Sequence, residues 1–72
     1  MRERNAEKPV DLLGYLIRTY TREGETVLDN AMGLGSTGVA AVKCGRRFVG
    51  MEIDRARFRA AQRRIMIAAE AC

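Results

Sequence analysis

The sequence has no histidine, a single proline and only two cysteines, which do not form a Cys-x-x-Cys pair. Because zinc sites in proteins are built from cysteine and histidine at short spacings, we expect no metal site. Nothing in the sequence indicates an oxidising compartment, so we expect Cys44 and Cys72 to be reduced thiols rather than a disulfide.

Long hydrophobic runs are also missing. A helix needs about 20 apolar residues to span a bilayer, and no segment of this sequence approaches that length. The charged residues 1–8 are not followed directly by the apolar stretch that a secretory signal has. We therefore expect a cytoplasmic protein with no membrane partner.

The size and charge of the chain set further limits. With 72 residues it is one domain at most, and cores of this size rarely contribute more than about 3–5 kcal/mol, so we expect marginal stability or folding on a partner. Lysine and arginine total 13 against 9 aspartates and glutamates, a net charge of +4. Such a balance favours polyanionic partners without requiring one.

The spacing of apolar residues predicts the order helix, strand, helix, strand, helix. We expect residues 1–8 to be a flexible segment and residues 9–72 to form the domain. The predicted elements are a helix over 9–22 with Pro9 in its first turn, a strand over 26–28, a helix over 37–44 capped by Gly45, a strand over 47–53 interrupted by Gly50, and a helix over 55–70 with Asp54 as its N-cap.

Two of these helices have predicted apolar faces. In the first, the residues at helical spacing are Leu12, Leu13, Leu16, Ile17 and Tyr20. In the last, the inward positions are Phe58, Ala61, Ile65 and either Ala68 or Ala69, with Arg55, Arg59 and Arg63 outward. The arginines of this helix have two interpretations: a surface for DNA phosphates, or the solvated side of a packing helix with buried stems.

The middle of the chain is predicted to be a strand–helix–strand unit with parallel strands and a right-handed crossover. The predicted fold class is thus α/β, a partial Rossmann-like fold with a two-strand parallel sheet. Ligands of such sheets bind beyond the carboxyl ends of the strands. Asp29 and a glycine loop over 30–36 follow the first strand, and Glu52 and Asp54 fall at the end of the second.

The loop itself spells G-x-G-x-x-G at Gly33, Gly35 and Gly38. An ordinary tight turn is one explanation, and the motif alone is weak support for a dinucleotide. Asp29 occupies the strand end, where its carboxylate would repel a pyrophosphate but suit a cationic ligand. S-adenosylmethionine is such a ligand, and Glu52 could accept hydrogen bonds from its ribose hydroxyls; alternatively, Glu52 is a solvated charge.

Three segments occur in a specific order: K-P-V-D-L-L, then V-L-D-N-A-M-G-L-G-S-T-G, then R-R-F-V-G-M-E-I-D. Together they resemble the cofactor-binding part of DNA methyltransferases that modify exocyclic amino groups, with the glycine loop most similar to phage-like, adenine-specific members. The resemblance extends from Lys8 to about residue 65. It implies a methyltransferase fold whose cofactor is S-adenosyl-L-methionine.

The resemblance also implies residue roles. Lys8 and Pro9 would begin the helix beside the methionine moiety, Glu52 would hold the ribose, and Asp54 would cap the last helix near the adenine. The cofactor loop would be formed by Asp29, Met32, Gly33, Gly35, Ser36 and Thr37. Leu34 stands where the family usually has serine.

The family places the target amino group with the motif [DNS]-P-P-[YFW], which also stacks the flipped-out base. Pro9 is the only proline, so this motif is missing and no catalytic residue is assigned. We expect a truncated product, prophage-derived or of restriction–modification type, or one part of a split enzyme, that is inactive alone. Its partners would be DNA, bound weakly, and the missing catalytic portion. The alternatives are a non-catalytic cofactor-binding or docking module and an NAD-binding Rossmann fragment.

Overall fold

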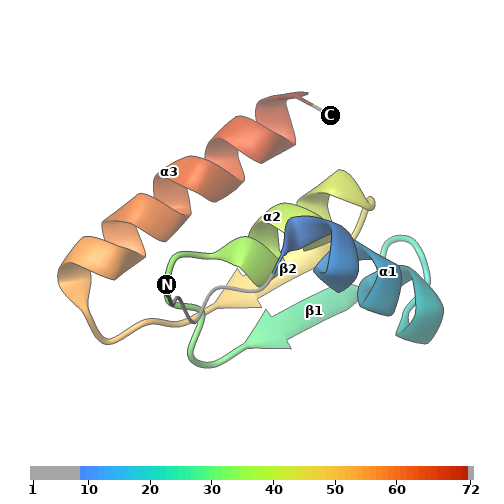
Figure 1. Cartoon of the computed structure of the whole chain (residues 1–72), viewed down its shortest axis with the longest axis horizontal. Helices are drawn as coiled ribbons and strands as arrows, with labels where there is room; N and C mark the ends of the chain where they lie inside the picture. Colours follow the sequence, from blue (N-terminus) through green and yellow to red (C-terminus); the bar gives the residue numbers. More distant parts are fainter. Residues whose placement is uncertain (1–8, 72) are drawn as a thin grey trace, which may run out of the picture.

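The structure of the chain is a computed structural model that describes residues 9–71. Two parts of the chain lie outside the described residues: the segment 1–8, which we expect to be flexible and which includes Lys8, and Cys72. The elements are α1 (Val10–Tyr20), β1 (Thr26–Asp29), α2 (Ser36–Lys43), β2 (Arg47–Gly50) and α3 (Arg55–Ala71). This order, with its two-stranded parallel sheet, confirms the predicted fold class (Figure 1).

The sheet has one covered face and one open face. Its register pairs Val27 with Phe48 and Leu28 with Val49. Val27 and Phe48 are half-buried under the helices, whereas Leu28 is 63% exposed and Val49 is 50% exposed. The apolar strand β1 is therefore buried on one face only, because α1, α2 and α3 all lie on the same side of the sheet (Figure 1).

Helix α2 is the centre of the core. It packs against both α1 and α3 and against both strands. Its small residues allow this close approach: Ala40 and Ala41 are almost completely buried and contact Ile17 of α1. The core is thus built from short side chains, and none of the larger ones is fully buried among the described residues.

The apolar faces of α1 and α3 are only partly buried. In α1 the buried positions are Gly14 and Ile17, while Leu12, Leu16 and Tyr20 are exposed, contrary to expectation. The physical reason is that the described part of α1 has α2 as its main packing partner, which covers a single narrow stripe.

In α3 the expected pattern is largely confirmed. Ala61 and Ala68 are buried, Ile65 is half-buried, and the outward arginines are exposed. Phe58 is 39% exposed, contrary to expectation; it lies in the first turn of α3.

Two element boundaries differ from prediction. Helix α1 starts one residue later than expected, with Pro9 as its extended N-cap, and it ends at Tyr20 because Thr21 adopts an extended conformation. Strand β2 ends at Gly50 rather than at residue 53, because β1 ends at Asp29, the register partner of Gly50. Ile53 is consequently fully exposed.

The caps predicted from the sequence are confirmed. Gly45 has a φ of 79° at the end of α2. Its N–H donates to the carbonyl of Val42 at 3.2 Å, and the N–H of Arg46 donates to that of Ala41 at 2.9 Å, which is the Schellman pattern. At the start of α3, Oδ1 of Asp54 accepts a hydrogen bond from the N–H of Arg57 at 2.9 Å.

Candidate cofactor site

The glycine loop lies at the carboxyl ends of both strands, between β1 and α2. It is tied to the segment that follows β2 by successive backbone hydrogen bonds. The N–H of Met51 donates to the carbonyl of Asp29 at 3.0 Å, and the N–H of Met32 donates to the carbonyl of Met51 at 2.9 Å. The loop and the residues after β2 therefore form one surface, as the parallel pairing predicts.

Glu52 connects the two sides of this surface. Its Oε1 accepts a hydrogen bond from the N–H of Gly33 at 2.8 Å, and its Oε2 accepts one from the N–H of Asp54 at 2.9 Å. Three of the predicted site residues are thus brought together by one half-buried carboxylate. A carboxylate offers about four acceptor positions, so two remain available to a ligand.

Asp29 is the second carboxylate at this edge. It is half-buried, and its Oδ1 accepts a hydrogen bond from the N–H of Ala31 at 3.1 Å, which turns the chain at the end of β1. Its register partner Gly50 ends the neighbouring strand just two residues before Glu52. The edge therefore has two carboxylates, which favours ligands with cationic or hydroxyl groups.

The first two glycines of the loop serve different purposes. A hydrogen bond from the N–H of Gly35 to the carbonyl of Met32, at 2.8 Å, closes a tight turn, and Gly33 and Gly35 both have positive φ, at 55° and 84°. Among the described residues 9–71, a Cβ at Gly33 would meet no atom within 4 Å. A Cβ at Gly35 would lie 2.8 Å from the Cβ of Ala61. Gly33 therefore leaves open space beside its backbone, whereas Gly35 lets α3 pack against the loop.

The third glycine, Gly38, serves helix packing. A Cβ there would lie 2.5 Å from Cδ1 of Ile65 and 2.7 Å from the ring of Phe48. Only a residue without a side chain lets α2 approach α3 and the sheet this closely. Of the three glycines in the G-x-G-x-x-G spacing, only Gly33 has space beside it that no described residue fills.

The other predicted site residues lie around the loop. Met32 is buried, with its sulfur against Gly50, so its side chain fills the space beneath the loop. Ser36 is buried and Thr37 half-buried at the N-terminus of α2, where the helix dipole is positive. Pro9 is exposed, and within residues 9–71 the structure records no hydrogen bond from it to the loop.

One contact was missed by the sequence analysis. Nη1 of Arg64 donates a hydrogen bond to the carbonyl of Leu34 at 2.8 Å. From the sequence, Arg64 is one of several arginines on the last helix, and its residue type alone does not set it apart from them. The signal that could have placed it is its spacing, because Ala61, Arg64 and Ile65 lie on one face of the helix.

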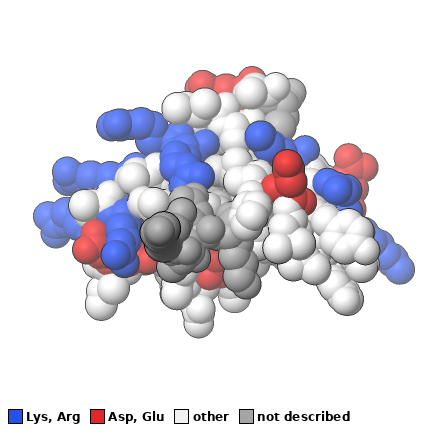
Figure 2. Space-filling view, viewed as in Figure 1, with Lys and Arg blue, Asp and Glu red and all other residues white. Residues whose placement is uncertain are grey.

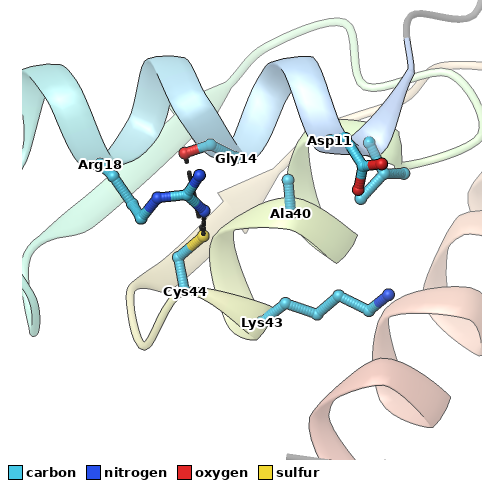
Figure 3. A pocket seen from close by; sticks show the side chains of 7 residues that line it. Asp11, Gly14, Arg18, Ala40, Lys43 and Cys44 are labelled. Carbon is cyan, nitrogen blue, oxygen red and sulfur yellow. Dashed lines mark hydrogen bonds between the residues drawn. The ribbon is translucent and has the colours of Figure 1, made fainter.

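A separate hollow of about 190 Å³ lies between α1 and α2 (Figure 3). Nη1 of Arg18 lies 3.4 Å from the sulfur of Cys44, which in turn lies 3.9 Å from the carbonyl of Gly14. The lining residues are Val10, Asp11, Gly14, Arg18, Ala40, Lys43 and Cys44. None of them belongs to the glycine loop, so this hollow is distinct from the candidate cofactor site.

Two kinds of feature are absent from the part of the chain that the structure describes. Over residues 9–71, no cluster of three histidine, cysteine or acidic side chains is arranged to hold a metal ion. Over the same residues, every helix is too short or too polar to cross a bilayer.

Comparisons with known proteins all point to the same family. Residues 2–63 match the sequence model of the N6/N4 methyltransferase family, described as DNA methylase. The chain is 39% identical over 59 residues to the type II methyltransferase M2.DpnII of Streptococcus pneumoniae, covering 82% of this chain and 22% of the relative. It is 44% identical over 64 residues to the putative methylase YubD of Escherichia coli K12, covering 89% of this chain and 28% of that protein.

A solved structure agrees with these matches. The crystal structure of M1.HpyAVI superposes with a TM-score of 0.80 at 31% sequence identity, over 90% of this chain and 32% of the other. The chain thus spans between a fifth and a third of the length of these relatives. The matched sequence segments, the shared fold and the glycine loop at the strand ends lead to one conclusion: this chain belongs to the N6/N4 family of DNA methyltransferases.

Proposed function

We propose that this chain is the S-adenosylmethionine-binding part of an adenine-specific DNA methyltransferase, with the cofactor held at the glycine loop. Methyltransferases of this family generally use that cofactor. The observation that carries the proposal is the hydrogen bond from Gly33 to Glu52, which fixes a carboxylate beside the open space at Gly33. Adenine specificity is supported by the residue pattern of the loop.

The residues present fit this cofactor. Its sulfonium and ammonium groups are cationic, and Asp29 and Glu52 make this edge of the sheet acidic. The two ribose hydroxyls can donate to the acceptor positions of Glu52 that Gly33 and Asp54 leave unused. When bound, the cofactor supplies an electrophilic methyl group; the residues of this chain bind it and orient it.

The open face and the edges of the sheet favour association with the rest of an enzyme. Leu28 and Val49 lie side by side on the open face, and a two-stranded sheet has two unpaired edges. Exposed apolar surface of this kind favours association with further elements of a methyltransferase domain. We therefore propose that the partner of this chain is a catalytic portion that contains the motif missing here.

DNA would be the substrate of the assembled enzyme. Lysine and arginine side chains gather on one side of the molecule, where α3 begins (Figure 2). The exposed arginines there are Arg55, Arg57, Arg59 and Arg63. Electrostatic attraction to phosphates is screened by salt, so the chain alone would bind DNA weakly at physiological ionic strength.

The first test concerns ligand choice. We expect the chain to bind S-adenosylmethionine and S-adenosylhomocysteine more tightly than NAD, because Asp29 and Glu52 repel a pyrophosphate and attract a cation. Isothermal titration calorimetry with the three ligands under one buffer condition measures this. Tighter binding of NAD would contradict the proposal and favour a dinucleotide-binding function.

The second test concerns activity. We expect the 72-residue chain to transfer no methyl group to DNA, even with saturating cofactor. Catalysis of this kind requires the base to be held opposite the methyl donor, and Tyr15 and Tyr20 lie on α1 without an adjacent Pro-Pro turn. Radiolabelled cofactor and unmethylated DNA at low salt provide the assay. Incorporation above a no-protein control that is lost in Gly33→Val would contradict this expectation.

A further inference from the structure

Helix α3 contacts the glycine loop through one face. The Cβ of Ala61 lies 2.8 Å from the position that a Cβ at Gly35 would take, and Ile65 lies against Gly38 one turn further along. Between them, Arg64 donates its hydrogen bond to the carbonyl of Leu34 at 2.8 Å. Helix α3 therefore packs against the loop and the start of α2 through Ala61 and Ile65, and Arg64 adds a hydrogen bond to the loop backbone.

Leu34 lies between two glycines, the residues with the greatest backbone freedom. These glycines, Gly33 and Gly35, both have positive φ, and they permit rotations that other residues do not. Its side chain is 41% exposed, so packing holds it only in part. Its carbonyl is the polar group by which α3 fixes the direction of the Leu34–Gly35 peptide.

The orientation of the Leu34–Gly35 peptide determines the conformation of the loop backbone. The N–H of Gly35 closes the turn onto Met32, and the N–H of Gly33 is held by Glu52. Rotation of the Leu34–Gly35 peptide would break the first of these bonds and displace the backbone beside the open space at Gly33. A donor on α3 that holds the Leu34 carbonyl prevents this rotation.

We propose that Arg64 is a positioning residue for the cofactor loop: its guanidinium holds the Leu34 carbonyl and thereby keeps the loop in the conformation that binds the cofactor. The effect on the ligand rests on the function proposed above. The effect on the loop does not, because it follows from the hydrogen bond alone.

Arg63 provides a matched control. It adjoins Arg64 on the same helix and has the same charge, but it is exposed and belongs to the outward face. Replacing either arginine with methionine removes one positive charge and keeps most of the apolar stem. Only Arg64→Met removes the donor to Leu34, so Arg63→Met controls for the loss of one positive charge on this helix.

The experiment compares Arg64→Met, Arg63→Met and Arg64→Lys in the full chain by amide NMR and by calorimetry with S-adenosylhomocysteine. We expect Arg64→Met to shift the amide signals of Leu34 and Gly35 and to speed hydrogen exchange at Gly35. It should also weaken ligand binding by about tenfold, the lower end of what a hydrogen bond to a charged group contributes. Arg63→Met should change neither. Arg64→Lys, which restores a charged donor, should recover part of both effects.

The outcomes separate the two proposals. If the amides and the affinity respond equally to Arg64→Met and Arg63→Met, Arg64 has no positioning role. If Arg64→Met is too unstable to measure and Arg64→Lys retains native amide signals, the contact itself is supported by that rescue. If the loop amides change as expected but the unmodified chain binds no S-adenosylhomocysteine, the proposed function fails while the positioning of the loop stands.

Discussion

Replacing Gly35 with alanine is expected to lower the free energy of unfolding by about 2–5 kcal/mol. The left-handed backbone at φ 84° costs an L-residue about 1–2 kcal/mol. The new methyl group would also meet the Cβ of Ala61 at 2.8 Å and its Cα at 3.1 Å, and overpacking of this kind costs about 1–3 kcal/mol. Because Ala61 lies on the body of α3 and not at the end of a flexible side chain, the helix itself would have to move.

A second glycine separates the two contributions. Gly24 has a φ of 89°, close to that of Gly35, but a Cβ there would meet none of the atoms of residues 9–71 within 4 Å. Gly24→Ala should therefore show the backbone cost alone, about 1–2 kcal/mol. Chemical denaturation gives the comparison: Gly24→Ala should keep a cooperative transition, whereas Gly35→Ala, whose loss approaches the whole stability expected of a chain of this size, should keep little or none. Equal losses for the two would show that α3 does not press on the loop at Gly35.

Replacing Glu52 with alanine is expected to weaken S-adenosylhomocysteine binding by about 100-fold. The variant loses the acceptors for ribose hydroxyls that we propose, and hydrogen bonds to charged groups contribute about 1.5–3 kcal/mol. It also releases the N–H groups of Gly33 and Asp54, so both the loop and the start of α3 lose a fixed partner. Calorimetry measures the affinity, and circular dichroism checks that the variant folds.

Glu70→Ala is the control for net charge. Glu70 is exposed near the end of α3 and away from the loop, so its replacement changes the charge by the same amount. Its affinity should stay within about twofold of the unmodified chain, as for surface substitutions in general. If the two variants bind the ligand equally well, Glu52 has no direct part in binding.

The order of elements could be predicted because it depends on local signals. Gly45 and Asp54 were recognised as caps from their positions alone, and the structure confirms both. The open face of the sheet could not be predicted. Val27 and Leu28 point to opposite faces of the sheet, and both are apolar. The sequence therefore does not reveal that helices cover only one of these faces. The same limitation explains Leu12 and Tyr20, which have helical spacing but no layer above them in the described structure.

The candidate site could be predicted at the level of positions but not of roles. The parallel pairing was sufficient to bring Gly33 and Glu52 together, since the carboxyl ends of neighbouring parallel strands meet at one edge. The spacing G-x-G-x-x-G could not show that Gly35 and Gly38 face α3, because that depends on where a helix from a distant segment packs. Arg64 was missed for the same reason: its partner is a backbone carbonyl 30 residues away.

The most direct measurement of the central claim is an amide NMR titration of the labelled chain with S-adenosylhomocysteine, which locates the ligand tested above by calorimetry. The account predicts shifts confined to the glycine loop and to the segment from Glu52 to Asp54. The amides of Gly14 and Cys44, beside the hollow between α1 and α2, should stay unchanged. Shifts concentrated at that hollow, with Gly33 and Glu52 unaffected, would contradict the placement of the cofactor at the loop.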